Sequence, residues 1–250
     1  MTQKKIINMN TRASAPTGFV DCHTHILPCM DDGADSLPVA LQMLESLHAQ
    51  GVRTVWLTPH FYPYKENLNT FLARRVNAYR SLISAPGLMN MQFCAASEVY
   101  LSDYLFNYTD LSELCIGSRN SMLLELPFDS QPFERIYQKI DKLMSYFGIS
   151  PVLAHIDRYP KIFQDKKHVE ALVNLGCMIQ VNLNSLSAGI LIKRKILNYI
   201  ENGCIHIVGT DCHNMGSRKP DFTAGISVIE KALGQHSVQQ LILNARSIMR

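Results

Sequence analysis

The chain has 250 residues, of which 47% are hydrophobic, and it carries a formal net charge of +3 at pH 7. This length suits one large α/β domain, and so weak a charge argues against nucleic acid as a partner. The sequence contains no run of about 18 uncharged apolar residues, so we expect no membrane span. The seven cysteines include no Cys-x-x-Cys pair, which favours a reducing compartment and a cytoplasmic protein.

Residues 1–18 contain no apolar segment of signal-peptide length, and we interpret them as a flexible N-terminal extension. Residues 19–250 form one predicted domain, because no internal repeat or linker divides them. After a first strand ending near Phe19-Val20, the predicted strands are residues 52–57, 91–99, 121–126, 151–154, 178–183 and 205–209. The helices predicted between and after them are residues 36–50, 68–83, 132–147, 167–175, 190–200, 227–233 and 238–248.

Seven strand–helix units in succession predict a parallel sheet with helices outside it. In a chain of this length the economical arrangement is a closed barrel similar to a TIM barrel. The alternative is an open doubly wound sheet, which would require a glycine-rich phosphate turn after the first strand. No such turn follows Phe19-Val20, so the fold class we expect is an α/β barrel.

Metal-ligating residue types stand at the ends of most predicted strands, where functional groups of a parallel barrel gather. They are His23 and His25, His60, Glu98, Glu125, His155, and Asp211 with His213. Such a crowd of titratable groups at one mouth requires neutralisation, which divalent ions supply. The sixth strand offers Gln180 and Asn182 instead, neutral side chains that we expect to contact substrate.

The histidine pair and Glu125 give the strongest support for a metal site. His23 and His25 are separated by one residue on an extended segment, so their side chains point to the same side, and Asp21 is placed to orient a ring. Glu125 lies inside the apolar run 122–126, where an unpaired carboxylate would cost several kcal/mol. A cation beside it is therefore favoured.

The remaining histidines have simpler interpretations. His48, His168 and His236 lie in or beside predicted helices and are expected to be ordinary helix-face residues. His206 starts the seventh strand, at the end of the barrel away from the chemistry, and is expected to be structural.

The order Asp-x-His-x-His at 21–25, Thr-Pro-His at 58–60 and Asp-x-His at 211–213 resembles the polymerase and histidinol phosphatase (PHP) superfamily. Longer motifs at 25–34, 97–101, 123–127 and 154–159 resemble the bacterial manganese-dependent tyrosine phosphatases of capsule and exopolysaccharide loci. The likeness extends from about residue 19 to the last helix. It implies a single-domain, distorted (β/α)₇ barrel of the PHP type that holds three divalent metal ions, manganese first and iron or zinc as alternatives.

The resemblance also implies a role for each ligand. His23, His25, Glu98 and Asp211 would bind the first ion. Glu98 would bridge to a second ion held by Glu125 and His155, and His60 and His213 would hold the third with Asp31. Arg158 and Arg218 match the phosphate-binding arginines of the family. The chain departs from the family pattern at Cys29, at Cys212, in the extra residues 1–18, and at 155–159, where His-Ile-Asp-Arg-Tyr replaces His-Pro-Glu-Arg-Tyr.

The resemblance implies hydrolysis of phosphotyrosine on a protein, with the tail of a bacterial tyrosine autokinase of polysaccharide synthesis as the expected substrate. The first alternative is a PHP-type hydrolase of a small ester such as histidinol phosphate, and the second is a non-catalytic regulator that docks on a kinase. An open groove suits a phosphoprotein, and Tyr62, Tyr64, Tyr100 and Tyr104 are candidates for its aromatic rim. The sequence is compatible with a homo-oligomer as well as with a monomer.

A thiol mechanism competes with the metal mechanism. Cys212 and Arg218 match the Cys-x₅-Arg pattern of thiol phosphatases, a short pattern that arises easily by chance. The next residue is Lys219 rather than the Ser or Thr that would help the thiolate leave. Asp211 and His213 flank the cysteine, so on an extended segment its side chain points away from theirs.

Overall fold

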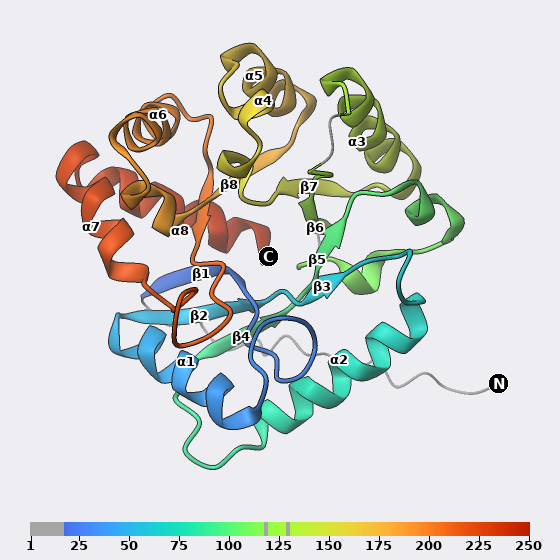
Figure 1. Ribbon diagram of the computed structural model, residues 1–250, viewed down its shortest axis with the longest axis vertical. Coiled ribbons are helices and arrows are strands. Elements are labelled where there is room, and N and C mark those ends of the chain that lie inside the picture. The colour runs from blue at the N-terminus through green and yellow to red at the C-terminus, as the bar shows by residue number, and fades with distance from the viewer. Residues whose placement is uncertain (1–17, 118–119, 129–130) are drawn as a thin grey trace.

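Figure 1 shows the computed structural model, which describes residues 18–117, 120–128 and 131–250. The predicted N-terminal extension, except for Gly18, lies outside the described residues. The strands form a central parallel sheet system, and most helices lie around its outside. Among the described residues, no helix combines the length and the apolar character needed to cross a bilayer.

The strands form two parallel sheets. The first has the order β1 (Phe19–Thr24), β2 (Val52–Leu57) and β4 (Gln92–Ala95). The second has the order β3 (His60–Phe61), β5 (Glu98–Tyr100), β6 (Ser121–Glu125), β7 (Ser150–Leu153), β8 (Met178–Asn182) and β9 (Ile207–Gly209).

The two sheets are connected where a strand of the first sheet is interrupted and the chain continues as a strand of the second. Thr58 and Pro59 separate β2 from β3, and the predicted strand 91–99 is divided by Ala96 and Ser97 into β4 and β5. Pro59 has no N–H to donate, which interrupts the pairing there. On the other side, the His25 N–H donates to the carbonyl of Cys212 at 2.9 Å and so links the end of β1 to the chain after β9. The parallel sheet is therefore curled.

The predicted helices are present with differences at their ends, and the short helix α4 is an addition that the sequence did not predict. They are α1 (Leu37–Ala49), α2 (Leu68–Ile83), α3 (Phe133–Phe147), α4 (Pro160–Phe163), α5 (Lys166–Leu175), α6 (Ile190–Glu201), α7 (Phe222–Leu233) and α8 (Gln235–Ile248). Short 3-10 segments are η1 (Asp103–Asn107), η2 (Ser112–Leu114), η3 (Ile156–Arg158) and η4 (Leu183–Ser187). Gly148 ends α3 with a φ of 63°, a left-handed conformation that glycine adopts without strain.

Two hydrophobic clusters hold the structure together. The larger one packs the outer faces of the strands against the helices. The smaller one lies on the inner side of the curl and gathers side chains from β1, β2, β4, β6, β7 and β9, with Trp56 as its largest member. Ala245 and Ile248 of α8 belong to this inner cluster. The inner faces of the strands are thus filled with side chains, which leaves the strand ends to carry the polar residues.

Candidate metal centre

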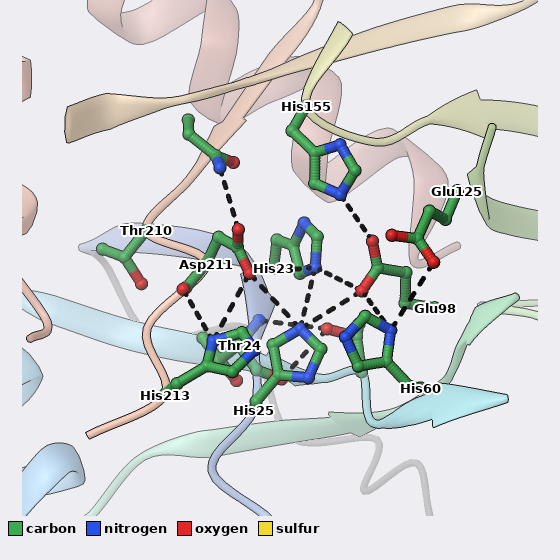
Figure 2. A network of polar contacts seen from close by, with 12 residues as sticks. His23, Thr24, His25, His60, Glu98, Glu125, His155, Thr210, Asp211 and His213 are labelled. Atoms are coloured by element: carbon green, nitrogen blue, oxygen red, sulfur yellow. Dashed lines mark hydrogen bonds and ion pairs between the residues drawn. The ribbon is translucent and has the colours of Figure 1, made fainter. Parts of the chain in front are cut away.

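The ligand-type residues predicted at the strand ends meet in one place (Figure 2). All of them are buried except His60, which is partly exposed. They come from β1, β3, β5, β6 and the segments that follow β7 and β9. The segments after β7 and β9 each contain a non-glycine residue in the left-handed region, His155 at φ 31° and Asp211 at φ 53°. Such strain concentrates at functional sites, where the surrounding structure enforces it.

His23, His25 and Asp211 form one group able to hold an ion, and Glu98 lies beside both of its histidines. His23 Nε2 lies 3.1 Å from His25 Nε2, 3.1 Å from Glu98 Oε2 and 3.6 Å from Asp211 Oδ1. His25 Nε2 lies 3.2 Å from the same Glu98 oxygen and 3.4 Å from the same Asp211 oxygen. Ligands about 2.1 Å from a central ion lie about 3.0–3.4 Å from one another in octahedral or tetrahedral coordination. The spacing therefore suits a metal ion.

Glu98 is the shared residue of the cluster. Its Oε1 accepts a hydrogen bond from His155 at 2.7 Å, and its Oε2 lies 2.9 Å from His60 Nδ1. Glu125 Oε2 approaches the same His60 nitrogen at 3.9 Å. His23 with Glu98 and His155 is one group able to hold an ion, and His60 with Glu98 and Glu125 is another. The expected set of Glu98, Glu125 and His155 is thus divided between two groups that share Glu98.

The third group contains Asp32 in the place where we expected Asp31. Asp32 Oδ1 lies 3.6 Å from His60 Nε2 and 3.5 Å from His213 Nε2. Asp31 points elsewhere: its Oδ2 lies 2.7 Å from His25 Nδ1 and also accepts from the backbone N–H of His60 at 2.8 Å. The role of Asp31 in this structure is to orient the His25 ring, so that Nε2 faces the cluster. The Asp-Asp-Gly run contained the signal for Asp32, but spacing alone could not choose between the two carboxylates.

Unpartnered polar atoms support a cation at this place. Within the part of the chain that the structure describes, four buried atoms of the cluster make no hydrogen bond of good geometry: His60 Nδ1, Glu98 Oε2, Glu125 Oε2 and His213 Nε2, although the first two face each other at 2.9 Å. A buried polar atom without a partner is costly. Imidazole nitrogens and carboxylate oxygens together are ligands for manganese, iron or zinc. The donor set therefore fits divalent metal ions.

The charges of the cluster depend on one another. Burial would raise the pKa of Asp211, but the His23 and His25 rings hold it well below its ordinary value. Burial and the adjacent Glu98 carboxylate raise the pKa of Glu125. Several carboxylates so close together require positive charge, which either protonated imidazoles or bound cations supply.

Buried polar residues behind the cluster hold the ligands in position. Burial raises the pKa of Asp21 to about 6, and its carboxylate accepts hydrogen bonds from the Thr210 N–H at 2.9 Å and the Thr210 hydroxyl at 2.6 Å. Asp21 therefore ties β1 to the chain after β9, while the His23 ring faces Gln180 Oε1 at 3.4 Å. Asn182 donates to Asp211 Oδ2 at 2.9 Å. Gln180 and Asn182 are buried and support the ligands, and Asn182 also lines the cleft beside Asp211.

Arg158 and Arg218 converge on Asp211 from the solvent side. Arg218 lies 3.0 Å from Asp211 Oδ1 and 3.3 Å from Asp32, and Arg158 lies 3.6 Å from Asp211 Oδ2. Both arginines line a polar cleft of about 420 Å³ together with Asn182. Residues 155–159, where the chain departs from the family pattern, are still anchored, because Asp157 accepts a hydrogen bond from the Ser185 hydroxyl at 2.6 Å.

Aromatic side chains flank the cluster beside His60. The Tyr62 ring stacks on the His60 ring with centroids 5.0 Å apart, and it lies 5.8 Å from Tyr64 and 5.7 Å from Tyr100. Burial and the carboxylate of Glu125 raise the pKa of Tyr62. Tyr62, Tyr64 and Tyr100 are called the tyrosine wall below. Among the ring contacts of the described residues, Tyr104 does not belong to it.

Cys212 is placed where a nucleophile could not act. Its side chain is fully buried, and burial raises the pKa of the thiol well above its ordinary value. A thiolate nucleophile needs a lowered pKa and access to the substrate. We therefore expect Cys212→Ser to keep phosphatase activity within about threefold of wild type, a margin that allows for a small packing change. Steady-state kinetics with metal analysis would check this; lost activity with full metal content would restore the thiol mechanism.

The family model for capsular polysaccharide synthesis proteins, CpsB/CapC, matches residues 19–250. Tyrosine-protein phosphatase CpsB of Streptococcus agalactiae serotype III (strain NEM316) is 24% identical over 252 residues, which cover 93% of this chain and 98% of the relative. Tyrosine-protein phosphatase YwqE of Bacillus subtilis (strain 168) is 28% identical over 239 residues, which cover 93% of this chain and 92% of the relative.

A solved structure agrees with the sequence relatives. The chain matches, with a TM-score of 0.75 and 26% identity, a crystal structure from work on YwqE of Bacillus subtilis and CpsB of Streptococcus pneumoniae, described as unique metal-dependent tyrosine phosphatases. The match covers 92% of this chain and 94% of that one. The resemblance predicted from the motifs is thereby confirmed. The chain belongs to the CpsB/CapC family of capsular polysaccharide synthesis proteins.

Proposed function

We propose that the protein is a metal-dependent protein-tyrosine phosphatase that acts in capsular polysaccharide synthesis. The observation that carries the proposal is the convergence of His23, His25, Glu98 and Asp211 at spacings of 3.1–3.6 Å. The family match and its phosphatase relatives supply the reaction class. A non-catalytic docking role is disfavoured, because so many buried charged groups are costly to assemble without a use.

The ligand groups suggest how metal ions would be held. We place one ion with His23, His25, Glu98 and Asp211. A second is proposed at Glu98 with Glu125 and His155, which belong to two neighbouring groups that share Glu98. A third would be held by His60, His213 and Asp32, with Asp31 orienting His25. The expected metal is manganese, with iron or zinc as alternatives. When bound, such ions supply Lewis acidity, which lowers the pKa of water toward neutrality and offsets negative charge on phosphoryl oxygens.

The protein's own side chains provide the rest of the chemistry. Arg158 and Arg218 would grip and neutralise the phosphoryl oxygens, because a planar guanidinium can donate to two oxygens at once and keeps its charge. The phenol of tyrosine has a pKa of about 10, so it leaves without the general acid that a serine alkoxide would need. No general acid is assigned for this reason.

The tyrosine wall favours an aryl ester over a small aliphatic one. Tyr64 is 49% exposed and meets Tyr100 edge-on at 5.6 Å, so the wall offers an accessible aromatic surface beside His60. Aromatic rings stack on one another with a gain of about 0.5–1.5 kcal/mol beyond burial. Phosphotyrosine would use this surface, whereas histidinol phosphate would need a closed pocket.

The closure of the barrel, the domain bounds, the cellular location and the substrate protein are also proposals. We propose that the two sheets complete a distorted (β/α)₇ barrel, since the inner cluster gathers side chains from β1 around to β9. Residues 19–250 would be one domain. The seven cysteines are free, in agreement with a reducing, cytoplasmic location. The substrate we favour is a tyrosine autokinase tail of the same polysaccharide pathway.

A comparison of two substrates tests the function. We expect the purified protein to hydrolyse a phosphotyrosyl peptide faster than histidinol phosphate, to lose this activity in EDTA and to regain it with added manganese. Faster turnover of histidinol phosphate would contradict the substrate class. Activity that persists in EDTA would contradict the metal mechanism.

Removal of Asp32 should release one metal ion and leave the others. Asp32 is the carboxylate that stands beside both His60 Nε2 and His213 Nε2. We expect Asp32→Ala to lower the bound metal by about one equivalent and kcat/KM by roughly 10–100-fold. Metal content and kinetics would be measured side by side with Asp103→Ala, an exposed aspartate of η1. Unchanged metal content in Asp32→Ala would return the ligand role to Asp31.

A further inference from the structure

A second cleft lies beside the metal centre, between the chain that follows β6 and the segment from η3 to α5. Its volume is about 470 Å³. The residues that shape it are Phe128, Phe133, Ile136, Tyr159, Ile162 and His168. Apart from Arg158, the residues of this cleft take no part in the proposed phosphatase reaction. A cavity of this size, with aromatic and aliphatic walls and polar groups among its lining residues, is typical of ligand-binding sites in proteins.

The walls of the cleft are aromatic and well packed. The Phe133 and His168 rings stack with centroids 3.9 Å apart and an interplanar angle of 16°. His168 Nδ1 also donates to the carbonyl of Lys161 at 3.1 Å, which fixes this ring to the opposite wall. The floor is formed by the buried side chains of Ile136 and Ile162. The cleft is therefore preformed for an apolar group.

Arg158 connects this cleft to the metal centre. It lines both the apolar cleft and the polar cleft beside Asp211. Its guanidinium lies 5.0 Å from the centre of the Phe128 ring, which in turn lies 6.1 Å from the His155 ring. In an extended peptide, side chains two residues apart on one face are separated by about 7 Å. A peptide whose phosphate is held by Arg158 can thus place a nearby side chain in the cleft.

The exposure and charge of the rim favour a peptide as the occupant. Phe128 is 52% exposed and lies against the Arg158 guanidinium, so its ring is accessible at the rim of the cleft. Arg158 and Lys161 give the rim positive charge, and among the lining residues that the structure describes Glu134 carries the one carboxylate. Acidic residues around an apolar side chain would be attracted to such a rim.

We propose that this cleft is a specificity subsite that binds an apolar side chain of the phosphoprotein, of phenylalanine or leucine size, within three residues of the phosphotyrosine. The proposal rests on the proposed phosphatase function and adds a sequence preference to it. Arg158 then serves two purposes: it holds the phosphate and forms the wall between the two side chains of the substrate.

A set of phosphotyrosyl peptides tests the subsite. The peptides differ only in one residue, phenylalanine or alanine, placed in turn at each of the three positions before and after the phosphotyrosine. We expect wild-type protein to show about tenfold higher kcat/KM for phenylalanine at one of these positions. Phe133→Ala and, separately, His168→Ala should reduce this preference to about twofold or less, while kcat/KM for a small aryl phosphate stays unchanged.

Tyr146→Ala provides the matched control, because Tyr146 is an exposed aromatic of the same helix α3 but does not line the cleft. It should keep the wild-type preference. Equal turnover of all peptides by wild-type protein would overturn the subsite and leave the phosphatase function standing. A preference that survives in both cleft variants would also overturn it. Failure of wild-type protein to hydrolyse any phosphotyrosyl peptide would instead overturn the proposed function.

Discussion

Replacement of Glu98 with glutamine is expected to lower kcat/KM for a phosphotyrosyl peptide by about 10³-fold or more. Glu98 is buried, and its two oxygens lie within 3.2 Å of His23, His25, His60 and His155. Glutamine keeps the size and one carbonyl oxygen but removes the negative charge that two neighbouring ligand groups share. Several kcal/mol of metal-derived charge stabilisation depend on those ligands, and about 1.4 kcal/mol corresponds to a tenfold change in rate.

The same variant should lose bound metal while it keeps its fold. Metal content after dialysis, circular dichroism and kinetics would be compared with Glu201→Gln, an exposed glutamate on α6. Loss of activity together with metal in Glu98→Gln alone is the expected pattern. Wild-type metal content with lost activity would show that Glu98 acts directly on the substrate, and wild-type activity would remove Glu98 from the centre altogether.

The sequence predicts most of this centre because its residues follow a rule of position. Parallel strands bring their carboxyl ends to one edge, so His23, Glu98 and His155 could be grouped from the strand assignments alone. What the rule could not provide is the direction of side chains in the loops. Asp31 and Asp32 are adjacent in sequence, yet one orients His25 and the other faces His60 and His213. The choice depends on how the loop turns after β1.

Helix ends show the same limit in the fold. The sequence predicts a helix from residue 227, but α7 begins at Phe222. Its first N–H groups, those of Phe222 and Thr223, donate to Gln50 Oε1 at 2.7 and 3.0 Å. Helices normally need a local cap for these groups, and here a side chain from the end of α1 supplies it. Local sequence contains no sign of a contact between segments so far apart.

Buried polar residues have a role that the sequence did not indicate. Gln180 and Asn182 were expected to contact substrate because neutral polar groups at a strand end suit that role. In the structure both are buried, and they connect His23, His155 and Asp211 by hydrogen bonds. Their position at the strand end was predicted correctly, and the structure adds ligand support, while Asn182 also lines the polar cleft. A ligand cluster with this many histidines needs such partners to fix each ring.

Loss of either arginine at the mouth should weaken phosphate binding more than metal binding. Arg158 and Arg218 both approach Asp211, so they could serve either to neutralise the ligand cluster or to hold the phosphoryl group. Both side chains remain partly exposed, which suits contact with an entering substrate. We expect Arg158→Ala and Arg218→Ala each to lower kcat/KM by about 10²-fold, the range found when one donor to a developing charge is removed.

Lysine variants and product inhibition separate the two roles. Lysine keeps the charge but not the planar fork, so Arg218→Lys should recover only part of the lost rate. The inhibition constant for inorganic phosphate should rise about tenfold in Arg218→Ala, while the metal content stays at the wild-type level. Arg194→Ala, an exposed arginine of α6, is the control. If instead Arg218→Ala loses metal and keeps its phosphate affinity, the arginine balances the charge of Asp32 and Asp211 rather than that of the substrate.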